Sequence, residues 1–372
     1  MFGQMNEDFD KYYEAVEPGM RERAYAWATA IGLQDVDGLK VSDFLLNTAK
    51  RNIEGEITDS EARKIVDEYY ETKEGHDQPD DVKEADKVSA RIKMVINSPT
   101  FTFSPAYYLG LHKQIFEGVF KFAGQIREVE LTKREWVLNG ESVQYSPSCM
   151  IEDTLAYDFE QERNFKYKGL SEDCFVEHFS SFISGIWQIH PFREGNTRAV
   201  AVFAIKYLRS MGYNVTNDLF AAKSWYFRNA LVRANYENRN LDVDKTQLPL
   251  EEFFKVLLYG YELELKNRYL RIGNEYGSPA AEAVKDLHRH DVVENSGDVG
   301  INVGIKYNDV LSHTEEMAVK AILRDNRLTA KSLSVVLGVT LRQAERIMAS
   351  LKKKANLRRE GSRKNGHWVF GD

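Results

Sequence analysis

The first seventy residues carry a helical pattern of apolar positions. In the segment 21–33, RERAYAWATAIGL, apolar residues recur at intervals of three and four, and Gly38 interrupts the run. Ser42 is suited to cap a second helix, and Thr58 with Glu61 forms a capping box ahead of a third. We therefore expect residues 1–85 to form a small helical module.

The next segments predict a boundary and then a second domain. Residues 73–87 hold almost no apolar side chain, which predicts a linker or exposed loop. Residues 86–275 are mainly helical in pattern, with one interruption between 129 and 145. There, short alternating segments flank Asn139-Gly140, a dipeptide typical of hairpin turns. A β-hairpin projecting from a helical core is predicted at this point.

The C-terminal hundred residues predict a linker and a third domain. Residues 276–312 are irregular and rich in turn-forming residues. Residues 313–372 predict three helices followed by two short strands around a turn at 361–366. This order is typical of a winged helix-turn-helix. The expected fold class of the chain is thus mainly α.

Composition places the chain among folded proteins of the cell interior. It is 43% hydrophobic and 29% charged. The first residues lack the basic and then apolar pattern of a secretory signal, and the apolar runs are far below the roughly 18 residues that cross a bilayer. We expect a cytoplasmic protein without a membrane partner, in which Cys149 and Cys174 are reduced core residues.

Charge is unevenly distributed along the chain. The formal net charge is −7, yet residues 314–372 hold 13 Lys and Arg against 6 Asp and Glu. The rest of the chain is therefore strongly acidic. A basic tail on an acidic body predicts two different kinds of partner.

One segment carries the chemistry. HPFREGNTR, from His190 to Arg198, places a base, an acid, a glycine, an amide and a guanidinium at the start of an apolar helix. The N–H groups of a helix N-terminus suit a phosphate, and Gly195 lets the backbone approach it closely. His190 is a suitable general base, Glu194 a suitable Mg²⁺ ligand, and Asn196 and Arg198 are donors for phosphate oxygens. These residues predict phosphoryl or nucleotidyl transfer.

The other histidines lack such a setting, and we interpret them as structural. They are His76, His112, His178, His288, His290, His313 and His367.

HPFREGNTR resembles the signature of the Fic family, H-x-F-x-[D/E]-G-N-G-R-x-x-R, except at one glycine and the last arginine. The resemblance extends over about residues 95–260, because the segments 111–127, 225–228 and 249–254 are similar to helices and turns of the family. The expected hairpin at 129–145 is similar to the family's flap, which holds a target peptide by strand addition.

The resemblance implies a transferase that moves AMP from ATP to a Ser, Thr or Tyr hydroxyl of a target protein and releases pyrophosphate. It implies His190 as the general base and Glu194 as the Mg²⁺ ligand. The implied phosphate contacts are Gly195, Asn196, Thr197 and Arg198, and the residues expected to meet the target are Leu131, Val137 and Val143.

Two departures from the signature concern the nucleotide site. Thr197 replaces a glycine, a change that a helix start tolerates and whose hydroxyl can hydrogen-bond locally. Ala201 replaces the last arginine, so one positive charge is missing near the terminal phosphate.

The N-terminal segment resembles the antitoxin-like module of some Fic proteins, in which a glutamate blocks that last arginine. Asp37 and Glu54 stand at the two positions that align with this glutamate, and both segments lack the module's Ser or Thr. With Ala201 opposite, the inhibitory salt bridge has lost both members, so we expect a mainly structural module. A large rise in self-labelling after deletion of residues 1–85 would contradict this expectation.

The expected third helix of the last domain presents basic and amide side chains that could enter a major groove. The candidate DNA-binding residues of this helix and of the wing are Arg342, Arg346, Arg363 and Lys364. Winged helices also serve as docking or dimerisation modules, so both DNA binding and a homodimer stay open.

The leading hypothesis is a Fic-type protein adenylyltransferase that uses ATP and Mg²⁺ and acts on a target protein. A related enzyme could transfer UMP, phosphate or phosphocholine through the same histidine. An alternative of another class is a DNA-binding transcriptional regulator with a nucleotide-binding, weakly active or inactive Fic core. Ala201 favours the regulator, whereas His190 and Glu194 favour the enzyme.

Overall fold

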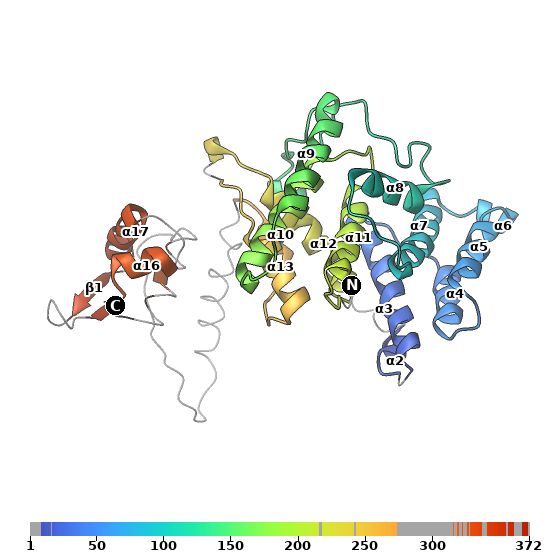
Figure 1. Ribbon diagram of the computed structural model, residues 1–372, viewed down its shortest axis with the longest axis horizontal. Helices are drawn as coiled ribbons and strands as arrows, with labels where there is room; N and C mark the ends of the chain where they lie inside the picture. The colour runs from blue at the N-terminus through green and yellow to red at the C-terminus, as the bar shows by residue number, and fades with distance from the viewer. Residues whose placement is uncertain are drawn as a thin grey trace. The chain divides into compact units, whose positions relative to one another are not determined.

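The computed structural model describes residues 9–15, 17–215, 218–241 and 243–273 and, further on, 315, 318–319, 322, 326, 328–336, 341–354, 356–360 and 367–370. The chain divides into two compact units, Met1–Ile272 and Gly273–Asp372 (Figure 1). This division lies close to the predicted domain end at residue 275. The predicted linker, 276–312, lies outside the described residues.

The first unit begins with a run of helices, of which those before residue 73 were predicted. They are α2 (Asp10–Tyr13), α3 (Pro18–Gly32), the 3-10 helix η1 (Leu33–Asp37), α4 (Asp43–Ile53), α5 (Asp59–Tyr69), α6 (Lys73–His76) and α7 (Asp80–Asn97). Ser42 caps α4 by accepting from the N–H of Leu45 at 3.1 Å, and the capping box of Thr58 and Glu61 begins α5. Gly38 ends η1 in the left-handed region, with φ of 72°.

The predicted linker at 73–87 is helical instead, as α6 and the first two turns of α7. The acidic residues Asp80 and Asp81 stand in the first turn of α7, where the helix dipole favours negative charge. Asp86 is buried and accepts hydrogen bonds from Ser42 and Tyr70. The charged composition that suggested a loop therefore belongs to a helix that binds the N-terminal helices to the rest of the unit.

The boundary expected near residue 85 does not separate two units. Ala26, Ala30 and Leu33 of the N-terminal segment belong to the same hydrophobic core as the helices that follow α7. A second core, around Trp27, joins α3, α4 and α5. The N-terminal helices are thus an integral part of the first unit.

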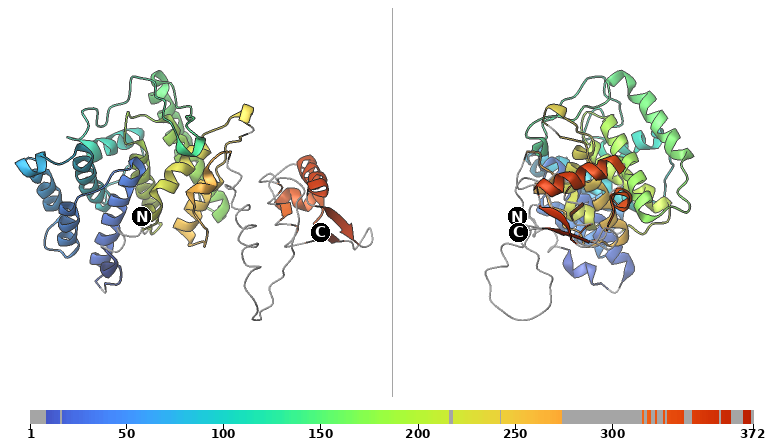
Figure 2. Two further views of the ribbon diagram at one scale, coloured as in Figure 1. Left: turned by 180° about the vertical axis from the view of Figure 1, so that it is seen from behind. Right: turned by 90° about the vertical axis from the view of Figure 1, so that its left-hand side faces the viewer.

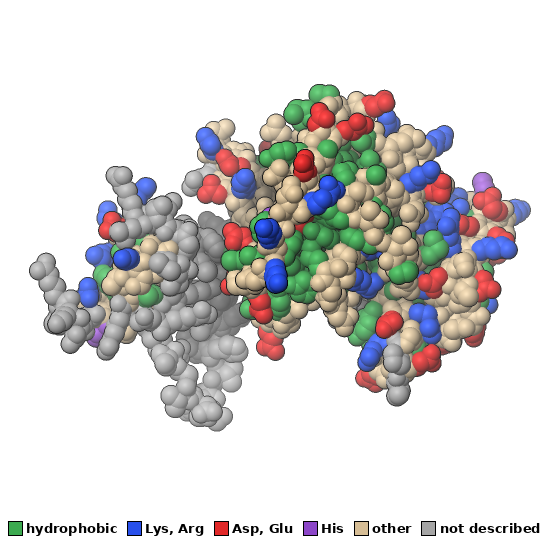
Figure 3. Space-filling model, in the orientation of Figure 1, with side chains coloured by type: hydrophobic (Ala, Val, Ile, Leu, Met, Phe, Trp, Pro, Cys, Tyr) green, Lys and Arg blue, Asp and Glu red, His purple; other side chains and the backbone are tan. Residues whose placement is uncertain are grey.

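The remaining helices surround one central helix. They are α8 (Pro105–Phe116), α9 (Ile151–Asn164), α10 (Glu172–Ile189), α11 (Asn196–Ser210), α12 (Asp218–Ala234) and α13 (Leu248–Tyr259), with 3-10 turns η3 (Ser148–Met150), η4 (Arg239–Leu241) and η5 (Asn267–Leu270). Every residue of α11 from Asn196 to Leu208 is buried, and Figure 2 shows this helix between the N-terminal helices and α12. Apolar side chains also gather on the surface over α10 and α13 (Figure 3).

The segment 129–145, which we call the flap segment, is not a β-hairpin. The chain reverses at Asn139-Gly140 as predicted, and both residues have positive φ. However, a 3-10 turn, η2 (Trp136–Leu138), precedes the reversal, and none of the residues 129–145, all of them described, is in a strand. Val137 and Leu138 are both buried, whereas successive side chains of a strand point to opposite faces. The apolar residues therefore anchor the segment to the core.

In the described residues of the second unit, two helices are followed by two strands, whereas most of the first predicted helix lies outside those residues. The unit contains α16 (Ala330–Val336), α17 (Leu341–Lys354) and the antiparallel strands β1 (Leu357–Glu360) and β2 (His367–Phe370), in which Leu357 pairs with Phe370. Its small core includes Ile322, Leu333 and Leu351. The winged helix-turn-helix stays a prediction.

Two further expectations were checked. Cys149 and Cys174 are exposed, so the prediction that they lie in the core was wrong. Cys149 lies in η3 and Cys174 in the first turn of α10, and the nearest buried apolar residues along the chain are Ile151 and Phe175. Within the described residues, no helix is both long and apolar enough to span a membrane.

Candidate active site

A short loop, residues 190–195, places the candidate base between two helices. His190 ends α10 with φ of 52°, and Gly195 precedes α11 with φ of 79°. A non-glycine residue in the left-handed region costs of order 1 kcal/mol or more and clusters at functional sites. Gly195 is required for a second reason, because a Cβ there would lie 2.4 Å from Cζ of Phe116.

His190 is a neutral base with one free nitrogen. Its Nδ1 lies 3.3 Å from the carbonyl oxygen of Trp187, whereas its Nε2 is buried and has no hydrogen-bond partner among the described residues. The proton is therefore assigned to Nδ1, which donates to that carbonyl. Burial, followed by the positive charge of Lys133, lowers the pKa of His190 well below its usual value. Nε2 thus holds a lone pair that can accept a proton.

The side chain of Asn196 stabilises this loop by hydrogen bonds to its backbone. The Asn196 amide donates to the Phe192 carbonyl at 2.7 Å and accepts from the Phe192 N–H at 3.0 Å. One N–H of the Asn196 amide is thus used within the loop, and the predicted contact of Asn196 with phosphate stays a prediction. Its backbone N–H, at the start of α11, is a further donor for an anion.

His112 supports the same loop from α8. Its Nδ1 accepts from the N–H of Gly124 and its Nε2 donates to the carbonyl of Glu194, both at 2.9 Å. The ring stacks on Phe192, and burial lowers its pKa to about 4. The interpretation of His112 as structural is consistent with these contacts, which make it a positioning residue.

Arg127 positions both the loop and the flap segment, and the sequence analysis missed it. It is buried, and its guanidinium donates to the carbonyls of His190 at 2.8 Å, Val129 at 2.7 Å and Ser146 at 2.5 Å. It therefore ties the left-handed backbone of the base to both ends of the flap segment. The only signal in the sequence was its place in the segment 111–127 that resembles the Fic family.

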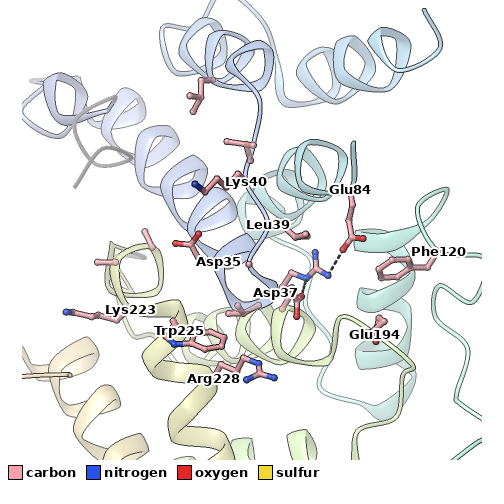
Figure 4. Close-up of a pocket in the computed structure, with 17 residues that line it drawn as sticks. Asp35, Asp37, Leu39, Lys40, Glu84, Phe120, Glu194, Lys223, Trp225 and Arg228 are labelled. Atoms are coloured by element: carbon pink, nitrogen blue, oxygen red, sulfur yellow. Dashed lines mark hydrogen bonds and ion pairs between the residues drawn. The ribbon is translucent and has the colours of Figure 1, made fainter. Parts of the chain in front are cut away.

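Arg198 is buried and contacts three residues of the N-terminal part, although the Asp37 contact at Nε is an ion pair without hydrogen-bond geometry. Its Nε lies 2.9 Å from Asp37 Oδ2, its Nη1 donates to Gln34 at 2.9 Å, and its Nη2 donates to Glu84 at 2.7 Å. Figure 4 shows the pairs with Asp37 and Glu84 at the wall of a pocket. Glu54, the other regulatory candidate, contacts Lys11 and Tyr12 instead.

The two departures from the signature have different consequences. Thr197 accepts a hydrogen bond from the indole N–H of Trp187 at 3.0 Å, so its hydroxyl ties α11 to α10. The predicted local hydrogen bond therefore reaches a neighbouring helix. Ala201 is fully buried in the core, and α11 has no charge at that position.

Glu194 and the flap segment meet at the site. The Glu194 side chain is 51% exposed and pairs with Lys133 at 2.9 Å, while Glu135 pairs twice with Arg228 of α12 at 2.6 and 3.1 Å. Within the part of the chain that the structure describes, no group of three or more His, Cys, Asp or Glu could hold a metal ion. Glu194 is therefore a single carboxylate, which suits Mg²⁺ only together with substrate phosphates.

The flap residues predicted to meet a target are mostly unavailable. Val137 and Val143 are buried in the core, and Leu131 is partly buried against it. Val129 and Trp136 are the exposed apolar residues of the flap segment, at 46% and 44%. The prediction of Val137 and Val143 was wrong because it assumed a strand with one face toward solvent.

A pocket of about 1180 Å³ opens beside Glu194 and Arg198. Its walls come from η1, from α7 and from α12, whose residues Lys223, Trp225 and Arg228 line it (Figure 4). Ligand pockets are typically about 300–1,000 Å³, so a nucleotide would fit. A second, very small cavity is lined by His190, Lys133 and Glu135.

The DNA-binding candidates are only partly described. Arg346 is exposed on α17, together with Lys352 and Lys353. Arg342 lies on the same helix, but its side chain is outside the described residues, as are Arg363 and Lys364. Arg358 and Arg359 are exposed on β1.

Comparisons with known proteins match this region. A family profile described as Fic/DOC family matches residues 102–208. The probable protein adenylyltransferase y4lH of Sinorhizobium fredii is 30% identical over 130 residues, which are 35% of this chain and 64% of that protein. The probable protein adenylyltransferase Fic of Salmonella typhimurium is 27% identical over 118 residues, 31% of this chain and 54% of its own. The chain thus spans less than two thirds of these relatives.

A solved structure is similar at a lower level. The crystal structure of BepC, a VirB-translocated effector protein of Bartonella tribocorum with bound AMPPNP, is 21% identical with a TM-score of 0.37. It covers 50% of this chain and 90% of that one. The matched family range, 102–208, includes His190, Glu194 and Arg198. The chain therefore contains a Fic/DOC family domain.

Proposed function

We propose that this protein is a protein adenylyltransferase, which transfers AMP from ATP to a Ser, Thr or Tyr hydroxyl of a target protein. The observation that carries the proposal is the buried, neutral His190 with an unpartnered Nε2, six residues before the first residue of α11. A proton acceptor beside an anion-binding helix end is what nucleotidyl transfer to a hydroxyl requires. Relatives named as adenylyltransferases support the same reaction.

The reaction follows from the residues of the site. The target hydroxyl oxygen forms a bond to the α-phosphorus, the bond from that phosphorus to pyrophosphate breaks, and the hydroxyl proton passes to Nε2 of His190. The N–H groups at the start of α11 bind phosphate oxygens. Glu194 would hold Mg²⁺, which neutralises phosphate charge when bound. The half-exposed Glu194 in a pocket of nucleotide size fits this role.

The flap segment is the proposed contact for the target. Among the described residues, no hydrogen bond involves the backbone of Leu131 or Thr132, so these groups are free to pair with an added strand. The exposed side chains of Val129 and Trp136 lie on the same segment. The pair of Glu135 and Arg228 fixes the flap segment to α12, while the backbone groups of Leu131 and Thr132 stay unpaired among the described residues.

The decisive experiment is labelling in cell lysate. Purified protein with Mg²⁺ and ATP labelled at the α-phosphate should label a protein band, and ATP labelled at the γ-phosphate should not. Label from the γ-phosphate would replace AMP transfer by phosphate transfer, and label from α-labelled UTP alone would make UMP the transferred group. No label from any nucleotide would end the proposal.

Asp37 restrains the phosphate-binding arginine in this proposal, and we expect its removal to increase activity. The sequence predicted a mainly structural N-terminal module because position 201 lacks the arginine that a glutamate would block. In the structure, Asp37 pairs instead with Arg198. Asp37→Asn should therefore raise nucleotide affinity and self-labelling by about 5- to 50-fold, within the usual range of coupling between sites. Glu54→Gln is the matched control and should change neither. Equal labelling by wild type and Asp37→Asn would favour the structural module.

DNA binding is the second candidate function, and the exposed basic residues of α17 and β1 favour it. Figure 3 shows Lys and Arg side chains on the described surface of the second unit. A regulator would bind DNA with affinity that falls steeply with salt. Arg346→Ala would weaken that binding, and binding without any labelling would favour the regulator over the enzyme.

A further inference from the structure

The flap segment brings one cation to the active site. Nζ of Lys133 lies 2.9 Å from Oε2 of Glu194, and Lys133 also lines the small cavity around His190. The backbone N–H of Lys133 donates to Oγ of Ser142 across the flap segment at 3.2 Å. Lys133 is therefore placed beside both the base and the candidate metal ligand.

Two arginines that line the larger pocket, Arg198 and Arg228, have stronger partners than Lys133. Arg198 is bound by Asp37, Glu84 and Gln34 and has a side chain only 1% exposed. Arg228 pairs twice with a fully buried carboxylate. Lys133 pairs with a carboxylate that is half-exposed, and such solvated pairs are worth little. Lys133 therefore exchanges its partner more easily than either arginine.

The first two turns of α11 carry one cationic side chain, that of Arg198. Ala201 is buried and apolar, so α11 offers a phosphate only its N-terminal N–H groups and the engaged Arg198. A nucleotide phosphate at this helix end carries negative charge into a partly buried site, and a lysine ammonium would neutralise it as a point charge.

We propose that Lys133 binds a phosphate oxygen of the nucleotide beside His190, and so supplies positive charge from the flap segment. This inference rests on the proposed function and deepens it, because it makes the flap segment part of the nucleotide site as well as the target site. Lys133 leaves Glu194 when it takes its phosphate partner, and Glu194 is then free for a divalent cation.

Binding to nucleotides of increasing charge tests the contact directly. The full chain, without divalent cations, is titrated with adenosine, AMP, ADP and ATP in a calorimeter. Lys133→Met should weaken binding of the phosphate-bearing ligands by about tenfold to a hundredfold, the usual effect of a charged hydrogen bond, and leave adenosine unchanged. Arg134→Met removes the neighbouring exposed cation and should leave the affinity for adenosine and for the phosphate-bearing ligands unchanged. Equal ATP affinity in wild type and Lys133→Met would overturn the proposal.

Repeating the titration in the Glu194→Gln variant distinguishes two roles of Lys133: contact with phosphate, and neutralisation of the Glu194 charge. If Lys133 only neutralises Glu194, then Lys133→Met will have no effect on ATP affinity once Glu194→Gln has removed that charge. If Lys133 binds phosphate, the loss of at least about tenfold persists in the Glu194→Gln background. Rescue by Lys133→Arg would support the contact further, since arginine also donates to phosphate.

The outcomes for this inference and for the transferase are distinguishable. Nucleotide binding that depends on Lys133, without labelling of any protein, would end the adenylyltransferase proposal and support the role of Lys133. Labelling with unchanged ATP affinity in Lys133→Met would do the reverse. A wild-type chain that binds none of the four ligands at millimolar concentration would overturn both.

Discussion

Replacing His190 is expected to reduce labelling of target protein by about 10²- to 10⁴-fold, the usual contribution of a general base. The free Nε2 of His190 accepts the hydroxyl proton in the proposed reaction, and its immediate surroundings hold no second unpartnered base among the described residues. His190→Ala tests this loss, and His190→Asn tests it more cleanly. Asparagine tolerates the left-handed backbone, with φ of 52°, and cannot take the proton at neutral pH.

The controls for His190 use a matched histidine and the pH profile. His76 is exposed on α6, and His76→Asn should label at the wild-type rate. Because the pKa of His190 is lowered, the ring stays neutral as the pH falls below 6.5, and kcat/KM should hold there before it declines. Labelling by His190→Asn within tenfold of wild type would show that another group accepts the proton.

Replacing Arg127 is expected to damage both stability and catalysis. Arg127→Met leaves the carbonyls of Val129, Ser146 and His190 without their donor, at roughly 1 kcal/mol or more for each buried group. The free energy of unfolding should therefore fall by about 3 kcal/mol, as measured by urea denaturation. Labelling should fall at least tenfold even where the protein is folded, because the guanidinium fixes the backbone of His190.

Two comparisons make the Arg127 prediction specific. Arg134→Met removes an exposed cation of the same segment and should change the unfolding free energy by less than about 0.5 kcal/mol. Arg127→Lys keeps the charge but cannot reach three carbonyls at once, so it should lie between wild type and Arg127→Met. A folded Arg127→Met that labels normally would show that the base needs no such support.

The sequence predicted those features that depend on local patterns. Helix caps at Ser42 and Thr58 follow from side chains that bond to backbone three residues away, and both are present. The turn at Asn139-Gly140 is equally local. The loop from His190 to Gly195 was found because its residues are adjacent in sequence, which places base and helix end together in any fold that continues into α11.

The rest depends on contacts between distant residues, which no local pattern shows. Val137 and Val143 looked like one face of a strand, but the core on one side of the segment buries them instead. The Asn196 amide binds the backbone of Phe192, a contact that the signature alone does not show. Lys133 stands in a charged run typical of a solvated surface, and only the fold brings it to Glu194.

In the proposed reaction, the N-terminal helices and the nucleotide compete for the side chain of Arg198, which has three partners in those helices and α7. Gln34 and Asp37 belong to η1, and Glu84 belongs to α7. Both elements pack into the same hydrophobic core. Thermodynamic reciprocity then requires that a ligand which withdraws Arg198 also loosens these helices by the same free energy. Mild heat or a partner protein that binds the loosened N-terminal helices would therefore act as an activator without touching the active site.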